Sequence, residues 1–222
     1  MEKFSFIKYL PDNSNSLMTT QLVECYRDVF ADQPWNEWLK CPLCQKHWGK
    51  KDQALLESHQ FKHCGVPLVD FWPREKVLSD IYAEITPQSS CWLAMDERKV
   101  VGFCWGYPVT ISELEAELGI ILEINHDCPR LASIAYQDDI GVIAGYRGRK
   151  LAKAMFARRL DDFLAQGLEI GIVRVKQNPE PSQTFLWFTE KLGYRVIARY
   201  PEKDGRVILG REFNGLKELL KS

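Results

Sequence analysis

The sequence predicts one α/β domain, and three patterns indicate it: a strand–turn–helix unit in the middle, hairpins on either side, and enough apolar residues for a core. The chain has 222 residues, of which 45% are hydrophobic, so one domain of ordinary size can bury a core and still carry an insertion. The central unit spans residues 136–166. In it, the β-forming Ile140 and Val142 precede a glycine-bearing turn, and apolar residues at helical spacing follow.

Composition excludes several classes of protein. The net charge of −1 disfavours a protein that binds nucleic acid through bulk positive charge, so nucleic acid is an unlikely partner. The sequence has no apolar run of about 18 residues, and its first residues lack the apolar stretch of a signal peptide. The seven cysteines are odd in number, and only Cys41 and Cys44 are closely spaced. We therefore expect reduced thiols, a cytoplasmic protein and no membrane partner.

The remaining elements are predicted from periodicity and from turn residues. Before the central unit we expect a strand at 4–10, helices at 17–30 and 75–85, and a hairpin of strands 91–95 and 100–107 that Pro108 ends. After it we expect a buried strand at 170–176. A helix should then begin at Ser182 as N-cap and end at Gly193, before a final hairpin of 194–200 and 206–213.

The turn of the central unit is suited to an anion. The first amides of a helix have no partner within the helix, and the helix dipole adds partial positive charge there. Arg147, Arg149 and Lys150 add formal charge at the same place, while Gly148 and the small Ala152 leave room for a bulky group. A pyrophosphate fits this chemistry. The alternative is an ordinary strand-to-helix turn with a solvated basic face.

The same turn resembles motif A of the GNAT acetyltransferases. The residues in register are Ile140, Val142, Tyr146, Arg147, Gly148 and Leu151. The signature Gln/Arg-x-x-Gly-x-Gly/Ala of that family falls on Arg147, Lys150 and Ala152. The sequence departs from the family where Ala144 replaces a common proline and Lys150 replaces the usual glycine. Residues 188–194, FTEKLGY, resemble a second segment of the family.

The resemblance implies a GNAT fold over residues 1–222, with a central mixed, mostly antiparallel sheet flanked by helices. It also implies an acyltransferase that moves an acetyl group from acetyl-CoA, its cosubstrate, to a primary amine. The strand around Ile140 should splay from its neighbour, so that its backbone contacts the pantetheine and polarises the thioester. The residues implied to bind the coenzyme are Ile140, Gly141, Val142, Arg147, Gly148, Arg149, Lys150, Leu151 and Ala152.

The attacking amine must be neutral, so the reaction needs a base. Asp138 is the candidate because it lies just upstream of the expected thioester position, whereas strand alternation predicts that Asp139 points to the opposite face. The family commonly protonates the leaving thiolate with a tyrosine, but that position is Thr189 here, and threonine is a far poorer acid. Tyr136, water or unassisted departure are the alternatives.

The acceptor is described only by its expected charge. The stretch 111–131 is rich in glutamate and precedes Asp138 and Asp139, which favours a cationic small molecule or a lysine if these groups face the cleft. The alternative for this stretch is a solvated helix face. Trp35, Glu37 and Trp38 are candidates for a pocket wall or for a hydrophobic lid. A GNAT-fold module that binds CoA or a protein partner with little catalysis is the alternative function. The oligomeric state stays open.

The segment 39–66 resembles a zinc finger with two cysteines and two histidines. Cys41 and Cys44 form a Cys-x-x-Cys pair, and His59 and His63 lie one helical turn apart. Trp48 and Leu56 occupy the positions of the finger's aromatic residue and core leucine, although the spacer is two residues too long. Cys64 and His47 are further candidate ligands. We expect a structural zinc that folds this core-poor insertion, and incidental histidines beside two thiols are the alternative.

Overall fold

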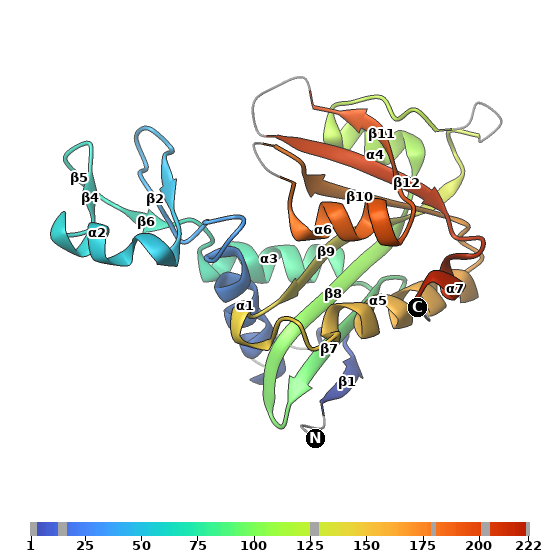
Figure 1. The fold of residues 1–222 in the computed structure, drawn as a ribbon, viewed down its shortest axis with the longest axis horizontal. Helices are drawn as coiled ribbons and strands as arrows, with labels where there is room; N and C mark the ends of the chain where they lie inside the picture. The colour runs from blue at the N-terminus through green and yellow to red at the C-terminus, as the bar shows by residue number, and fades with distance from the viewer. Residues whose placement is uncertain (1–3, 13–16, 125–128, 179–180, 201–204, 221–222) are drawn as a thin grey trace.

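The framework of the protein is a seven-stranded sheet (Figure 1). The computed structural model describes residues 4–12, 17–124, 129–178, 181–200 and 205–220. The strands follow the order β1 (Ser5–Lys8), β7 (Ser90–Asp96), β8 (Lys99–Thr110), β9 (Ser133–Val142), β10 (Ile170–Lys176), β12 (Arg206–Glu212) and β11 (Arg195–Arg199). Neighbouring strands are antiparallel except β9 and β10, which are parallel. This is the mixed, mostly antiparallel sheet that the sequence predicts.

Helices cover both faces of the sheet. The helices are α1 (Leu17–Phe30), α3 (Arg74–Glu84), α4 (Ile111–Leu118), α5 (Leu151–Ala165), α6 (Gln183–Leu186) and α7 (Leu216–Leu219). Successive side chains of a strand point to opposite faces, so Leu93 and Phe103 pack with α1 and α3, whereas Ala94 and Cys104 pack with α5. None of the described helices is both long and apolar enough to cross a bilayer.

Pro108 does not end its strand, and the prediction that it does is wrong. The strand β8 continues to Thr110, and Pro108 pairs with Ala135 of β9. The strand β7 accompanies β8 only as far as the pair Ser90–Gly106, so Pro108 lies where β8 has become an edge on that side. A missing amide costs no ladder hydrogen bond on an open edge, and proline is therefore tolerated there.

The last helical segment begins and ends at the predicted residues but changes type. Ser182 caps α6, because its hydroxyl oxygen accepts a hydrogen bond of 3.0 Å from the amide of Phe185. The chain then continues as a π-helix, η3 (Trp187–Lys191), before Gly193 turns it with a φ of 68°. The wider π turn lies in the segment that resembles the family motif.

Residues 39–66 and the strand that follows build small sheets of their own, which project from the main sheet in Figure 1. Their elements are β2 (Leu39–Lys40), β3 (His47–Trp48), the 3₁₀ turn η1 (Lys50–Asp52), α2 (Gln53–Ser58), β4 (Lys62–His63), β5 (Val66–Pro67) and β6 (Val69–Asp70). The strands β3, β2 and β6 form one sheet, and β4 and β5 form a hairpin. The buried core of this segment is small and consists of Cys41, Trp48 and Leu56.

Candidate functional site

The strands β9 and β10 separate in the middle of the sheet. They pair only at Ala135–Gly171 and Tyr136–Ile172, although β9 continues to Val142. On its other side β9 stays paired with β8 along this stretch, for example at Gly141–Phe103. The backbone of β9 beyond Tyr136 therefore has no ladder partner on the β10 side among the described residues, and its peptide groups are available to a ligand there.

A cavity of about 530 Å³ opens along the free part of β9. Its lining comes from five parts of the chain, namely Val29, residues 33–35, residues 140–142, Arg147 with Ala152, and residues 181–184 with Trp187. The volume lies in the usual range for small-molecule sites. Five of the nine residues implied to bind the coenzyme line this cavity: Ile140, Gly141, Val142, Arg147 and Ala152.

The basic turn beside the cavity contains two residues with left-handed backbones. Gly148 and Lys150 both have left-handed backbones, with φ of 79° and 62°, and Lys150 is the N-cap of α5. Only glycine adopts this conformation without steric cost, which explains why glycine is usual at the position of Lys150. The side chain of Lys150 is exposed, so the turn accommodates it without a clash.

Arg147, Arg149 and Leu151 make different contacts. Arg147 donates to the carbonyls of Val142 and Gln33 at 3.1 and 3.2 Å, so its guanidinium joins the turn to the far wall of the cavity. Arg149 points elsewhere, because its guanidinium stacks on the ring of Tyr146 at 5.3 Å. Leu151 is buried in the core below α5.

A β-bulge lies at the point where β9 and β10 separate. The pairing of β8 with β9 shifts between Trp105 and Tyr107, so that Gly106 opposes both Gln137 and Asp138. The extra residue interrupts the alternation of side chains.

Asp139 pairs directly with Trp105, whose indole packs on the face covered by α1 and α3. Asp138 contacts Glu84 of α3 on that same face. The expectation that Asp139 points to the opposite face is therefore wrong, and the bulge is the reason.

Three carboxyl groups form an acidic cluster at the bulge: Glu84, Asp138 and Asp139. Burial and the nearby charge of Asp138 raise the pKa of Glu84 to about 9. Burial also raises the pKa of Asp138, while the hydrogen bond with Glu84 opposes this shift. Burial and the charge of Asp138 raise the pKa of Asp139 well above its usual range. With a pKa near 9, Glu84 holds a proton at neutral pH. Glu84 forms a hydrogen bond with the carboxyl group of Asp138, and the indole of Trp105 donates to Glu84 at 2.9 Å.

A buried arginine supports the bulge from the opposite face. Arg159 of α5 is fully buried and donates to the carbonyl of Trp105 at 2.6 Å and to that of Asp139 at 3.3 Å. Its second nitrogen donates to the side-chain oxygen of Gln137 at 3.1 Å, and the Gln137 amide donates to the hydroxyl of Tyr194 at 2.7 Å. Sequence reasoning missed Arg159, although a charged residue in the apolar stripe of a helix is a usable signal.

The two hydroxyl groups considered as acids have different surroundings. Thr189 lies on η3, and its hydroxyl donates to the carbonyl of Phe185 at 2.8 Å. The phenol of Tyr136 is buried beside the carboxyl group of Asp138. Burial and the charge of Asp138 raise the pKa of Tyr136 well above its usual range. Neither group is a ready acid in this arrangement.

Two glutamates of the acidic stretch 111–131 stabilise the local structure. Glu113 accepts hydrogen bonds from Thr110 in the capping box of α4, and Glu115 pairs with Arg130 at 2.7 Å. Asp127 lies outside the described residues. Burial and the charge of Asp138 raise the pKa of Glu117.

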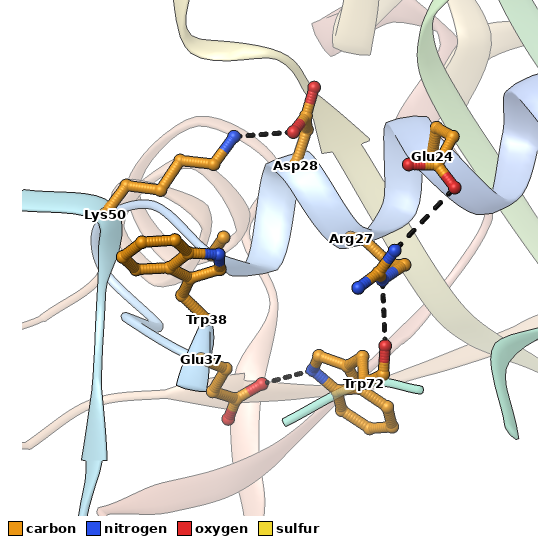
Figure 2. A pocket seen from close by; sticks show the side chains of 8 residues that line it. Glu24, Arg27, Asp28, Glu37, Trp38, Lys50 and Trp72 are labelled. Atoms are coloured by element: carbon orange, nitrogen blue, oxygen red, sulfur yellow. Dashed lines mark hydrogen bonds and ion pairs between the residues drawn. The ribbon is translucent and has the colours of Figure 1, made fainter. Parts of the chain in front are cut away.

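The two predicted tryptophans lie in different places. Trp35 lines the cavity beside β9, whereas Trp38 lines a separate hollow of about 230 Å³ between α1 and the insertion. Figure 2 shows that hollow, where the buried Glu37 accepts a hydrogen bond of 2.9 Å from the indole of Trp72. Glu37 also lies 3.6 Å from Arg206 of β12, so it links the insertion to the main sheet.

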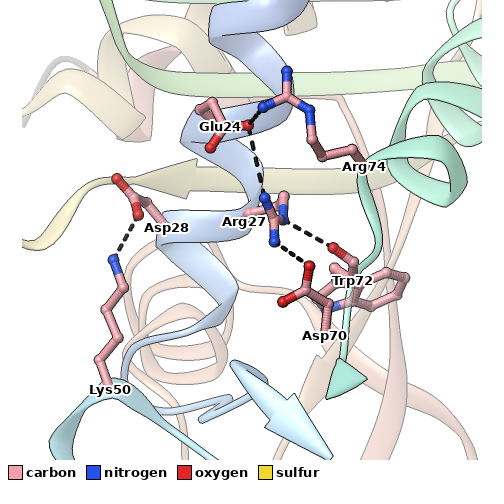
Figure 3. Close-up of polar contacts among 7 residues, drawn as sticks. All are labelled: Glu24, Arg27, Asp28, Lys50, Asp70, Trp72 and Arg74. Carbon is pink, nitrogen blue, oxygen red and sulfur yellow. Dashed lines mark hydrogen bonds and ion pairs between the residues drawn. The ribbon is translucent and has the colours of Figure 1, made fainter. Parts of the chain in front are cut away.

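Charged pairs fix the insertion to α1, as Figure 3 shows. Arg27 binds Asp70 at 2.6 Å and the carbonyl of Trp72 at 2.9 Å, and Lys50 pairs with Asp28 at 2.6 Å. The groups around this hollow thus satisfy one another. The hollow is a structural junction, and the cavity beside β9 is the candidate active site.

The predicted metal ligands converge only in part. The sulfur atoms of Cys41, Cys44 and Cys64 lie within 4.8 Å of one another. The ring of His63 instead packs edge-on against Trp48, with centroids 4.9 Å apart. His59 lies at the C-terminal end of α2 and is exposed.

Comparison with known proteins identifies the family. The structure is similar to that of Arabidopsis thaliana NAA60 in complex with acetyl-CoA, with a TM-score of 0.53, 13% identity, and coverage of 96% of this chain and 100% of that one. An acetyltransferase from Streptococcus agalactiae gives a TM-score of 0.52 at 14% identity, covering 96% and 99% of the two chains. At such identities the likeness shows the fold alone. No curated protein matches the sequence significantly. The family model of the acetyltransferase (GNAT) family matches residues 52–194, more than half of the chain, and the protein therefore belongs to that family.

Proposed function

We propose that this protein transfers an acetyl group from acetyl-CoA to a positively charged primary amine, on a small molecule or a lysine. The observation that carries the proposal is the cavity along the free part of β9, which ends at the basic turn before α5. The pantetheine would lie along the peptide groups of residues 140–142, and the pyrophosphate would bind the first amides of α5. A structural neighbour solved with acetyl-CoA supports this assignment.

Within this proposal, the acidic cluster selects the acceptor. Glu84, Asp138 and Asp139 are crowded together, and Glu84 holds a proton to relieve the repulsion. A cationic amine near the cluster would be attracted by the carboxylates and would in turn stabilise their ionised forms. The buried Glu37 adds negative charge on the insertion side, and its electrostatic interaction with Asp139 places it near the cluster.

The proposed reaction begins with loss of a proton from the ammonium group of the acceptor to Asp138, directly or through water. The neutral nitrogen then attacks the thioester carbonyl, whose developing negative charge is stabilised by the free backbone amides of β9. The carbon–sulfur bond breaks with departure of the CoA thiolate, and the acylated nitrogen releases its second proton to water to give the neutral amide. Thr189 and Tyr136 stay candidates for the proton that the thiolate takes up, together with water.

The insertion is proposed to bind a structural zinc ion, with Cys41 and Cys44 among its ligands. Three thiols that converge in a segment with a small core support this part of the proposal.

Turnover of acetyl-CoA against a panel of amines tests the proposed activity. The panel holds monoamines, polyamines, aminoglycosides and lysine peptides, with matched alcohols as controls, and release of CoA thiol is measured. We expect release with cationic amines and none with the alcohols. Binding of acetyl-CoA by calorimetry without turnover on any amine would favour a CoA-binding module with little catalysis instead.

A further inference from the structure

We propose that the insertion binds one zinc ion through the thiolates of Cys41, Cys44 and Cys64 and the Nε2 atom of His59. The three sulfur atoms lie within 4.8 Å of one another. Around a tetrahedral zinc with bonds of about 2.3 Å, sulfur atoms are separated by roughly 3.8 Å. A zinc ion between the three sulfurs therefore needs only a small inward movement of each.

The backbone of two separate turns brings these sulfurs together. In the first turn, the amide of Gln45 donates to the carbonyl of Cys41 at 3.0 Å, and the amides of Leu43 and Cys44 point at the Cys41 sulfur. In the second turn, between β4 and β5, Cys64 has a left-handed backbone with a φ of 50°. The Cys41 sulfur lies 3.7 Å from the carbonyl oxygen of His63, which joins the two turns.

The backbone of this segment is also unusually strained for its small core. Left-handed φ values at non-glycine residues occur in the described chain at Glu97 and Lys150, and in the insertion and its entry at Asn36, Gln45, Gln60, Phe61 and Cys64. Such conformations persist only where the surroundings hold them. The core of Cys41, Trp48 and Leu56 is too small for this, and a metal bound to both turns would supply the constraint.

His59 is the proposed fourth ligand, and its exposed ring must turn toward the sulfurs, because its nitrogens are not among the ligand atoms that converge within 4.8 Å. Its Nδ1 atom lies 2.8 Å from the carbonyl of Leu55, so this nitrogen carries the proton and Nε2 is left as a lone-pair donor. His63 packs on Trp48, and the ring of His47 packs on Phe71 with centroids 5.3 Å apart. His126 lies outside the described residues.

The donor set favours zinc over other uses of three thiols. A disulfide would consume two sulfurs and leave the third unpaired, and a buried hydrophobic cluster would not expose Cys44 and Cys64. Iron–sulfur clusters are generally held by four cysteines, whereas three thiolates with one imidazole form a common structural zinc site.

The metal has a consequence for the acceptor side of the cavity, and this consequence rests on the proposed function. Cys41 directly follows β2, and the amide of Trp38, just before β2, donates to the carbonyl of Trp48 at 3.0 Å. The chain from Trp38 back to Trp35 carries Glu37 and one wall of the cavity. Zinc would thus hold the outer end of the segment whose inner end faces the acceptor.

The test measures metal content and the cobalt spectrum of the full chain. We expect about one zinc per chain by elemental analysis, and intense sulfur-to-cobalt charge-transfer absorption after exchange with Co²⁺. Cys64→Ser should weaken zinc binding by roughly 10- to 100-fold or more in chelator competition, and His59→Ala should do the same. The matched control His63→Ala should keep both the metal and the spectrum.

A conservative exchange guards against variants that merely misfold. His59→Cys replaces the imidazole with a fourth thiolate, so it should retain zinc and strengthen the charge-transfer bands, whereas His63→Cys should leave them unchanged. Wild-type protein that neither carries nor takes up zinc or cobalt would overturn the site. Loss of zinc in His63→Ala, with retention in His59→Ala or Cys64→Ser, would overturn the ligand set. None of these readouts depends on acetyl transfer, so they remain decisive if the proposed activity fails.

Discussion

Replacing Asp138 by asparagine is the sharpest test of the proposed chemistry. The side chain keeps its size, and its amide oxygen can still accept the proton that Glu84 donates, so the bulge should survive. The amide cannot take a proton from the acceptor. Removal of a general base typically costs about 10²- to 10⁴-fold in rate, which corresponds to about 3–5 kcal/mol in the barrier. We expect a loss of kcat/KM in this range.

The assay is the initial rate of thiol release between about pH 6 and pH 10, with Asp139→Asn as the matched control. Asp139 shares the acidic cluster but lies one residue further from the bulge. If Asp138 is the base, its variant should lose most of kcat while acetyl-CoA affinity stays the same, and Asp139→Asn should mainly raise the KM for the amine. A well-folded Asp138→Asn protein that keeps more than about one-tenth of kcat/KM would refute the reasoning, as would a larger loss in Asp139→Asn.

Three further variants test other parts of the site. The pKa of Glu84 is near 9 in the folded protein, above its usual value of 4.5. Its contribution to stability is therefore complete below pH 4.5 and is lost as the pH rises through 9. Glu84→Gln should make the free energy of unfolding in urea fall less steeply between pH 4.5 and pH 9. Lys150→Gly should raise the melting temperature by about 2–4 °C, because it relieves a left-handed backbone worth about 1 kcal/mol, whereas Lys150→Ala should not. Arg147→Glu should weaken acetyl-CoA binding in calorimetry, since it places like charge beside the phosphates, and unchanged affinity in a folded variant would exclude the turn as the coenzyme site.

Local patterns predicted the elements well. The helix at 17–30 and the strand at 170–176 have the predicted bounds, because periodicity and end signals are encoded within each segment. Pro108 shows the limit of this reasoning. Whether a proline ends a strand depends on whether a neighbouring strand pairs with its amide side. Here β7 ends before it reaches Pro108, and this depends on long-range pairing that the local sequence does not encode.

In the candidate site too, the features that are local in sequence were predictable, and those that depend on long-range contacts were not. The basic character of the turn was predictable because Arg147, Arg149 and Lys150 lie within four consecutive residues. Glu84 and Arg159 come from helices on opposite faces of the sheet, and only the fold brings them to the bulge. The shared face of Asp138 and Asp139 likewise follows from an extra residue in β9 that no pattern in the strand reveals.

The acidic cluster connects the two proton transfers of the proposed reaction. Tyr136 is a poor acid in the resting protein, because burial and then the negative charge of Asp138 raise the pKa of its phenol. When Asp138 takes the proton of the acceptor, that charge disappears, and the pKa of Tyr136 should fall toward its ordinary value. The phenol would thus become a better proton donor at the stage when the thiolate leaves. Thr189 lacks this coupling, because its hydroxyl is bound to the carbonyl of Phe185 and its acidity does not respond to Asp138 in the same way.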